Sequence, residues 1–375
     1  MLGKRKILMV TGSLRVGGME NVAMNIARYI DRNQFQINFV VYGDEIGEYE
    51  NEVYELGGEV FHIPFPREGT TKYCSALNRI INSTGPYDVV HSHNLFPSGM
   101  VMKVAHQSGV PIRIAHSHTN RNDTHLNIVR RIYQRYMREL MWKHATQLFA
   151  CSNRAGNYLF QEKFQNHGFV MNNGVATEKI FIDKMTRDAL RKEFGLTTER
   201  IIGHTGRFVE VKNHSLLVDI FKAVFEQDAN VKLMLIGDGP LRKTVEERVH
   251  NLGLEDRVIF TGMRSDVPSL LSLMDVYVLP STYEGVSVSL MEAQAAGVPF
   301  VVSTSAYSAE SRVTEYGTSL DLSDSVEKWR NAVIEQMNRG KLSNAAEIVI
   351  EKGYDTRSIV NFVQENYYKV KETVI

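Results

Sequence analysis

Two glutamates in the second half of the chain have the type and spacing to bind polar groups of a ligand. Seven residues separate Glu284 from Glu292. The apolar run 275–279 indicates a buried strand that ends at Pro280, and a helix is expected to follow and to stop at Gly297. One carboxylate would then precede the helix and the other would lie two turns inside it. The backbone N–H groups between them suit an anion such as a diphosphate, and the carboxylates suit hydroxyls.

The whole run at residues 280–299 resembles the Glu-x7-Glu motif of retaining glycosyltransferases of the GT-B class. These enzymes have two Rossmann-like domains that face each other across a cleft, and their family 4-like group contains bacterial capsule, exopolysaccharide and lipopolysaccharide transferases. The resemblance implies that Glu284 holds the donor sugar at the reaction centre and that Glu292 binds the ribose hydroxyls. It also places four residues against the donor, namely Gly285, Val286, Ser287 and Val288. A capped surface helix with incidental acids is the plainer alternative.

Two cations follow the strand expected at 201–205. Arg207 and Lys212 suit a diphosphate leaving group, because arginine offers a bidentate fork and lysine a point charge. A solvated loop with two surface cations is the alternative. The spacing reproduces the Gly-Arg-x-x-x-x-Lys signature of the same family, which implies that Arg207 and Lys212 hold the donor diphosphate beside Gly206.

A glycine-rich turn follows the first expected strand. Gly12 and Gly17 have P-loop spacing, but Gly18 and Met19 replace the lysine and the Ser or Thr that a nucleoside triphosphatase needs. The segment is either a plain tight turn or a loop whose backbone approaches a phosphate or sugar. A Gly-Gly loop lies over the donor diphosphate in the resembling family, which implies this role for Gly17 and Gly18.

Two other expected strand ends are candidates for contact with the nucleotide-sugar donor. The segment Leu235–Pro240 indicates a strand that runs into a glycine-rich turn, and a simple connection explains it equally well. Because the family has this turn beside the donor, the resemblance implies a donor-binding role for Asp238. It also implies main-chain contacts to the nucleotide base near Met263. No side chain identifies the base, and a UDP-sugar is the favoured donor.

Four histidines form two His-x-His pairs after expected strands, and they are His91, His93, His116 and His118. Zinc is one interpretation, but no cysteine or carboxylate stands nearby in the sequence to complete a ligand set. Hydrogen bonding to neighbouring loops is another. Because ligands bind at the carboxyl ends of parallel strands, a substrate-facing role is favoured. The resemblance implies that His118 is catalytic, with His93 as the alternative catalytic or acceptor residue, and no metal is expected.

Sugar transfer from a nucleotide diphosphate requires that the leaving diphosphate be stabilised as its charge grows. The two cations and the helix N-terminus could do this without a metal. Asp321 and Asp324 lack the spacing of an Asp-x-Asp metal motif, so no cofactor is expected. A sugar-nucleotide epimerase and a non-catalytic sugar- or nucleotide-binding protein stay open as alternatives. A glycosidase carboxylate pair would leave the cations and the Gly-Gly loop unexplained.

The segment 121–143 is rich in arginine and carries interleaved apolar residues. It is either a solvated amphipathic helix or a surface that contacts an anionic membrane. A transferase with a lipid-linked acceptor would use such a contact. The expected partners are therefore a nucleotide-sugar donor and a saccharide or lipid-linked acceptor, with peripheral membrane contact through 121–143 as an open alternative.

At 375 residues the chain is expected to form two domains. Apolar runs alternate with helical patterns in both halves, which predicts two doubly wound parallel sheets. We expect an acceptor-binding domain at 1–180 and a nucleotide-sugar-binding domain at 181–354. By resemblance alone, a helix within 355–375 crosses back onto the first domain. The expected strands are 6–11, 36–42, 60–63, 88–91, 112–116, 148–151, 201–205, 231–236, 258–261, 275–279 and 300–303.

The composition is that of a soluble globular protein, with 43% hydrophobic and 23% charged residues. A net charge of zero argues against a general nucleic-acid binder. Cys74 and Cys151 are far apart in sequence, which fits a reducing compartment. The apolar run 7–10 is too short for a signal peptide or a membrane span. We expect a cytoplasmic protein, peripheral at the inner face of the plasma membrane if 121–143 binds lipid.

Overall fold

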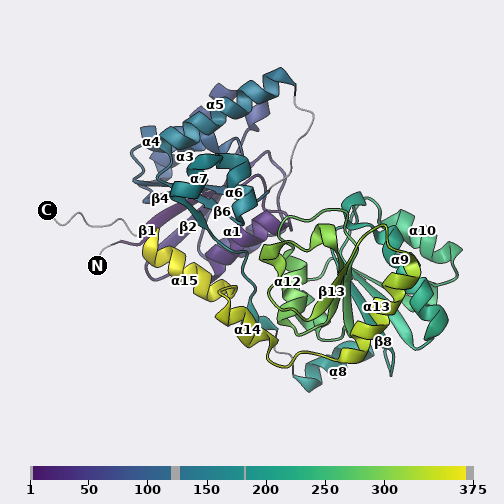
Figure 1. The fold of residues 1–375 in the computed structure, drawn as a ribbon. Coiled ribbons are helices and arrows are strands. Elements are labelled where there is room, and N and C mark those ends of the chain that lie inside the picture. Colours follow the sequence, from purple (N-terminus) through teal and green to yellow (C-terminus); the bar gives the residue numbers. More distant parts are fainter. Residues whose placement is uncertain (1–2, 120–126, 181–182, 369–375) are drawn as a thin grey trace. The chain divides into compact units, whose positions relative to one another are not determined.

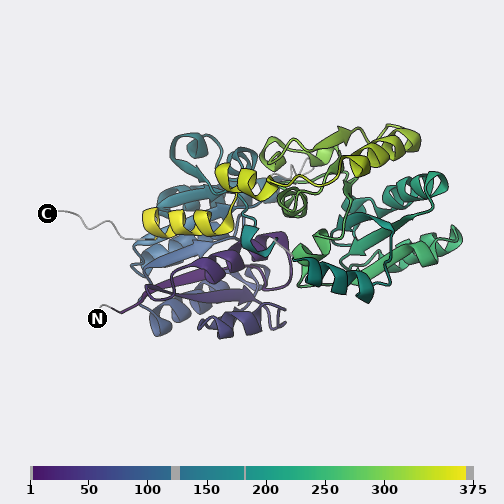
Figure 2. The ribbon, with the colours of Figure 1, turned by 90° about the horizontal axis from the view of Figure 1, so that it is seen from below.

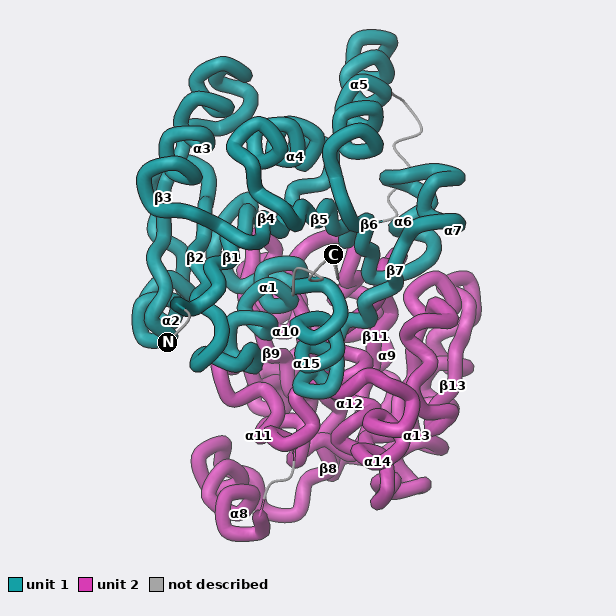
Figure 3. The backbone as a smooth tube through the Cα atoms, turned by 90° about the vertical axis from the view of Figure 1, so that its left-hand side faces the viewer, with its two compact units in different colours: residues 1–174, 356–375 teal, residues 175–355 magenta. Residues whose placement is uncertain are grey.

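The computed structural model describes residues 3–119, 127–180 and 183–368 of the chain (Figure 1). Two compact units are present, and Figure 3 shows them in teal and magenta. Unit 1 combines Met1–Gly174 with Thr356–Ile375, and unit 2 is Val175–Asp355. The first boundary precedes the expected one by a few residues, because Val175 already donates a backbone hydrogen bond to Tyr354 of unit 2.

Unit 1 contains, within its described residues, a parallel sheet in the order β3-β2-β1-β4-β5-β6-β7. Every strand expected in this half is present. The additional strand β7 has only three residues and begins with a glycine, so it carries little apolar signal. The strands are β1 (Arg5–Val10), β2 (Phe35–Tyr42), β3 (Val60–Ile63), β4 (Val89–Ser92), β5 (Ile112–Ser117), β6 (Gln147–Ala150) and β7 (Gly168–Val170).

Helices cover both faces of this sheet. They are α1 (Gly18–Tyr29), α2 (Glu50–Glu55), α3 (Thr70–Thr84), α4 (Ser98–Gln107), α5 (Ile128–His144), α6 (Asn153–Phe160), α7 (Glu162–His167) and α15 (Thr356–Asn366). Ile7 and Met9 of β1 lie on one side of the sheet, as the period of two in a strand requires, and pack in one cluster with α1 and α15. Figure 2 shows α15 in yellow beside the purple α1. A hydrogen bond from the Asp31 backbone to the Gln364 side chain, 3.0 Å long, ties the end of the chain to the unit.

Unit 2 repeats the plan with a parallel sheet in the order β10-β9-β8-β11-β12-β13, as far as its described residues show. All five strands expected here are present, and β13, α8 and α14 were not expected. The strands are β8 (Arg200–Thr205), β9 (Val231–Ile236), β10 (Val258–Gly262), β11 (Val276–Leu279), β12 (Phe300–Ser303) and β13 (Gly317–Leu320). The helices are α8 (Lys184–Glu193), α9 (His214–Gln227), α10 (Arg242–Asn251), α11 (Val267–Leu271), α12 (Val288–Ala295), α13 (Val326–Arg339) and α14 (Ala345–Glu351).

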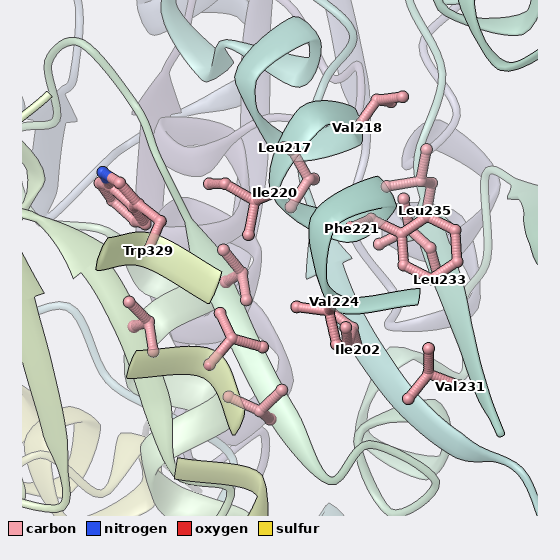
Figure 4. Packing of buried hydrophobic residues seen from close by; sticks show 14 of the residues in the cluster. Ile202, Leu217, Val218, Ile220, Phe221, Val224, Val231, Leu233, Leu235 and Trp329 are labelled. Atoms are coloured by element: carbon pink, nitrogen blue, oxygen red, sulfur yellow. The ribbon is translucent and has the colours of Figure 1, made fainter. Parts of the chain in front are cut away.

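The core of unit 2 has two apolar layers, one on each face of its sheet. Ile202, Leu233 and Leu235 join α9, α10 and α13 in the layer drawn in Figure 4, where Trp329 is fully buried. The alternate residues Ile201 and Met234 join α8, α11 and α12 in the other layer. Apolar residues on both sides of each strand are what a doubly wound sheet requires, so the expected fold class is confirmed.

Both sheets reverse their strand order at an equivalent place. The reversal lies between β1 and β4 in unit 1 and between β8 and β11 in unit 2. Loops on the two sides of such a reversal run in opposite directions and leave space at the carboxyl ends of the strands, where ligands of this fold class bind. The fold therefore directs attention to the loops that follow these four strands.

Candidate functional site

In unit 2, an ion pair joins the loops that follow β8 and β11. Lys212 Nζ donates to Glu284 Oε1 at 2.7 Å, and the two side chains are only 15% and 14% exposed. Ser281 Oγ donates to the same oxygen at 2.8 Å. Both bonds use Oε1, so within the described chain Oε2 is left to accept from a ligand. Two residues that were expected to act together are thus in direct contact.

Arg207 differs from Lys212 in its surroundings. Its side chain is exposed, and its guanidinium makes no hydrogen bond with any residue that the structure describes. A guanidinium whose donors are all unused within the described chain is suited to an incoming anion. The structure places Arg207 next to Gly206, as the sequence requires, at the carboxyl edge of the sheet.

The glycine-rich turn after β9 packs closely against the turn after β8. Gly237 has φ +135°, and a Cβ there would lie 2.2 Å from the carbonyl oxygen of Gly206. The Phe208 N–H donates to the Asp238 carbonyl at 3.0 Å. The Asp238 carboxylate accepts from the Gly239 N–H and from Arg242, and the backbone bond to Gly239 is the main reason why its pKa is lowered. The Asp238 carboxylate therefore stabilises this turn. A contact with the nucleotide-sugar donor would be a second role of the same residue.

Helix α12 begins at Val288, and its start is open. The cap residue Ser287 makes no side-chain hydrogen bond to a backbone N–H of the helix, and its hydroxyl lies 3.3 Å from Ser289 Oγ instead. Among the described residues, no backbone acceptor takes the N–H of Gly285, Val286, Ser287 or Val288. Together these groups form the positive end of the helix dipole, which favours an anion.

Glu292 lies inside α12 and has a carboxylate without a partner. Burial raises its pKa to about 7. No side chain or backbone group in the described parts of the chain donates a hydrogen bond to it. A desolvated carboxylate without a donor is unfavourable, and hydroxyl donors from a ligand would relieve this.

Tyr277 is a site residue that the sequence analysis missed. It is fully buried on β11, and its hydroxyl lies 3.2 Å from the Thr205 carbonyl and 3.0 Å from Ser289 Oγ. These contacts join β8, β11 and α12 at the place where Glu284 lies. The available signal was a tyrosine inside an apolar strand, because a buried tyrosine hydroxyl usually has a partner.

Met263 follows β10, and its side chain is 52% exposed. Because β10 is the edge strand of the sheet, Met263 is separated from the β8 loop by β9. The expected contact with a nucleotide base therefore stays a prediction.

In unit 1, the two glycines expected to approach a ligand differ in their surroundings. A Cβ on Gly17 would lie 2.5 Å from Glu20 Oε2, the end of a flexible side chain that can move away. A Cβ on Gly18, at the start of α1, would meet nothing within 4 Å. Glu20 is a second missed residue. It accepts from Ser13 Oγ at 3.2 Å, and burial raises its pKa.

The four histidines form one buried cluster at the ends of β4 and β5. His91 Nε2 lies 3.1 Å from His116 Nδ1, and His93 Nδ1 lies 2.8 Å from His118 Nε2. The hydroxyl of Tyr368 lies 2.7 Å from His91 Nδ1 and ties the returning end of the chain to the cluster. Burial lowers the pKa of all four rings, and the pKa of His91 and His118 falls to about 3.

The donor nitrogens of His91, His93 and His116 lie within 4.8 Å of one another, a spacing that could hold an ion. In the described structure the ring nitrogens instead pair with each other, because His91 Nε2 bonds with His116 Nδ1 and His93 Nδ1 bonds with His118 Nε2. The expected absence of a metal stays a prediction.

The amphipathic segment is partly described. Residues 121–126 lie outside the described residues, and 127–143 belong to the start and body of α5. From Asn127 to Tyr136 every side chain except that of Gln134 is exposed, including Ile128 at 73% and Ile132 at 64%. A search of the described helices found none that is long and apolar enough to span a membrane.

Two family models match the chain. The model of glycosyl transferases group 1 matches residues 186–354, and the model of the glycosyl transferase 4-like domain matches residues 17–173. The putative glycosyltransferase EpsF of Bacillus subtilis is 31% identical over 370 residues, which cover 97% of this chain and 96% of EpsF.

Two further proteins are similar to this chain. A protein of Escherichia coli named UDP-Gal:alpha-D-GlcNAc-diphosphoundecaprenol alpha-1,3-galactosyltransferase is 27% identical over 225 residues, 58% of each chain. The crystal structure of HepE from Anabaena in complex with UDP-glucose aligns with a TM-score of 0.77 and 19% identity, over 96% of this chain and 98% of HepE. At this identity the second likeness shows the fold alone.

Proposed function

Since the chain belongs to the group 1 glycosyltransferases, with a 4-like domain in its first half, we propose that it is a retaining enzyme that uses a UDP-sugar. The acceptor we propose is a saccharide or a lipid-linked saccharide in the synthesis of a cell-surface polysaccharide. The observation that carries the proposal is the partly buried carboxylate of Glu292, which has no hydrogen-bond partner in the described chain and follows the open start of α12 in sequence. An anion with hydroxyls close by, as in a nucleotide sugar, satisfies both features.

Three groups of unit 2 have distinct tasks in this proposal. Glu292 accepts hydrogen bonds from the ribose hydroxyls, which stabilise its charged form. The free guanidinium of Arg207 and the N–H groups that precede α12 receive the diphosphate, and they stabilise the charge that it gains on leaving. Lys212 adds a second cation, and Glu284 offers its remaining oxygen to a hydroxyl of the sugar.

The transfer itself needs no protein nucleophile. The acceptor oxygen forms its bond to the anomeric carbon on the face from which the diphosphate departs, so the configuration is retained. The bond to the diphosphate breaks, and the departing diphosphate takes the proton of the acceptor hydroxyl. We propose that no metal takes part, because Arg207, Lys212 and the α12 N-terminus supply positive charge at the leaving group.

The exposed face of α5 supports a lipid-linked acceptor. Ile128, Val129 and Ile132 stand with the exposed Arg131 and Arg135 on the same two turns. Apolar side chains flanked by arginines are typical of a helix that lies in the headgroup region of an anionic membrane. We propose that α5 holds the enzyme at the inner face of the plasma membrane. The relative named for a diphosphoundecaprenol acceptor supports the same class of acceptor.

A donor screen tests the proposal. Purified protein is incubated with UDP-, GDP-, ADP- and TDP-sugars in the presence of EDTA, and binding and release of nucleoside diphosphate are measured, with the variant Glu292→Gln as comparison. We expect saturable binding and slow hydrolysis of one UDP-sugar, both weakened in the variant. Conversion to an epimeric sugar nucleotide would indicate an epimerase, and binding without turnover would indicate a binding protein. Binding of no sugar nucleotide would contradict all three.

A further inference from the structure

His93 and His118 occupy equivalent places at the ends of neighbouring parallel strands. His93 directly follows β4 and His118 directly follows β5, and the two strands pair in register, with Ser92 opposite Ala115. The His93 backbone N–H donates to the Val10 carbonyl at 2.9 Å, which fixes this residue to β1 as well. The backbone of His93 is therefore fixed between β1 and β4, beside the end of β5.

The two imidazoles share one hydrogen bond and differ in access. His93 Nδ1 lies 2.8 Å from His118 Nε2. His93 is 2% exposed, and its other nitrogen, Nε2, is buried without a partner in the described structure. His118 is partly exposed, and no described residue bonds to its Nδ1. His118 is therefore the more exposed ring of the pair.

Both rings must be neutral. A hydrogen bond between two imidazole nitrogens needs one N–H and one lone pair, and burial makes a charged ring unfavourable at either position. The pKa of His93 is well below its usual value and that of His118 is lowered to about 3, in each case chiefly through burial. Each ring then carries one N–H and one lone pair.

Only one arrangement of the two protons avoids a buried N–H without an acceptor. If the proton of His93 were on Nε2, that N–H would have no partner, which is rare in folded proteins and costs about 1–3 kcal/mol. If the proton is on Nδ1, it is donated to His118 Nε2. The proton of His118 must then be on Nδ1, the nitrogen to which no described residue bonds. This is an assignment from the hydrogen-bond network.

Building on the glycosyltransferase function proposed above, we propose that His93 is a positioning residue that holds His118 as its neutral Nδ1–H tautomer. His118 then offers an N–H donor to an oxygen of a bound substrate. A neutral donor stabilises an oxygen that gains negative charge and keeps its own proton. This gives His93 a role that acts through His118 and requires no contact of its own with the substrate.

Two substitutions at one position separate this role from a purely structural one. In His93→Asn the amide nitrogen can take the place of Nδ1 and donate to His118 Nε2. In His93→Leu the donor is lost at similar volume. The tautomer of His118 is measured from its ring ¹⁵N shifts, assigned by their loss in His118→Asn. Turnover is measured as UDP release from the UDP-sugar that the wild-type protein hydrolyses fastest, and a thermal melt confirms that each variant folds.

We expect the Nδ1–H tautomer in the wild type and in His93→Asn, and loss of this preference in His93→Leu. Turnover in His93→Leu should fall about 10- to 100-fold with little change in the donor KM, and His93→Asn should restore it to within about threefold. An Nε2–H tautomer in the wild type would overturn the inference, as would equal turnover of the two variants. If no sugar nucleotide is hydrolysed, the proposed function fails, and the tautomer measurement alone decides the role of His93.

Discussion

The two sheets reverse their strand order at equivalent places, but the side chains near these places differ in charge. In unit 1 the ends of β4 and β5 carry neutral histidines that hydrogen-bond to one another. In unit 2 the ends of β8 and β11 carry an ion pair and an arginine without a partner in the described chain, and α12 carries a carboxylate that also lacks a partner there. One sheet order can therefore present either uncharged donors or charged groups, depending on which side chains follow its strands.

The comparison also indicates what each unit can bind. The charged groups in unit 2 suit a diphosphate and the ribose beside it, both of which need strong and opposite electrostatic partners. The neutral cluster in unit 1 suits hydroxyl and other uncharged oxygens, for which a charged partner would have to be desolvated at higher cost. Variants that remove or neutralise one side of this contrast should affect different steps of the reaction.

Removal of the Lys212 charge should have the largest effect on turnover. Lys212→Ala deletes a cation beside the leaving diphosphate and leaves Glu284 half-buried without its partner. We expect kcat to fall about 100- to 1000-fold, with a smaller change in donor KM, because the charge matters most in the transition state. Lys222→Ala is the matched control, since Lys222 forms an exposed pair within α9. Equal kcat in the two variants would remove Lys212 from the reaction.

Neutralisation of Glu292 should act on binding. Glu292→Gln keeps the size of the side chain but weakens its bonds to hydroxyls, and we expect the Kd for the UDP-sugar to rise about 10- to 100-fold. Because the pKa of Glu292 is about 7 in the free protein, binding by the wild type should also weaken as the pH falls from 8 to 6. The variant should show no such dependence. Parallel pH profiles of the two proteins, measured by calorimetry, would contradict this assignment.

The same carboxylate should reduce stability. Its pKa is raised on folding from 4.5 to about 7, so the folded state holds the proton more tightly than the unfolded state. The resulting stabilisation is complete below pH 4.5 and is lost as the pH rises through 7, a difference of roughly 3 kcal/mol. Glu292→Gln should therefore melt at a higher temperature than the wild type at pH 8 and at a similar temperature near pH 4.5. A lower Tm of the variant at pH 8 would mean that the carboxylate has a stabilising partner.

These groups differ in how far the sequence could predict them. The strands were visible as apolar runs, and only short or polar ones such as β7 and β13 escaped. Arg207 and Lys212 could be proposed from their spacing, but the contact of Lys212 with Glu284 joins residues 72 apart and depends on β8 and β11 being neighbours. The histidine pairs were visible, whereas their stacking depends on the register of β4 and β5. The sequence alone therefore did not predict which strands are neighbours or in which register they pair.

The two units also differ in where their exposed apolar residues lie. Five of the exposed large hydrophobic residues lie on the first three turns of α5 in unit 1. The double variant Ile128→Glu and Ile132→Glu should reduce binding to vesicles that contain phosphatidylglycerol by about tenfold or more, because the apolar contact is replaced by like charge. Ile46→Glu, at another exposed position of unit 1, is the control. Unchanged sedimentation of the double variant with these vesicles would show that α5 is a solvated helix.

The smallest effects should come from the two buried tyrosines that support the strand ends, one in each unit. Tyr368 bonds to His91 in unit 1, and Tyr277 bonds to Thr205 and Ser289 in unit 2. Replacement of either by phenylalanine removes a buried hydrogen bond and should lower the free energy of unfolding by about 1 kcal/mol. Only Tyr277→Phe should also reduce turnover, by a few-fold, because its hydroxyl connects β11 to the start of α12. The two variants are compared by urea unfolding and by UDP release. A loss of turnover in Tyr368→Phe as large as that in Tyr277→Phe would mean that the histidine cluster depends on the returning end of the chain for its geometry.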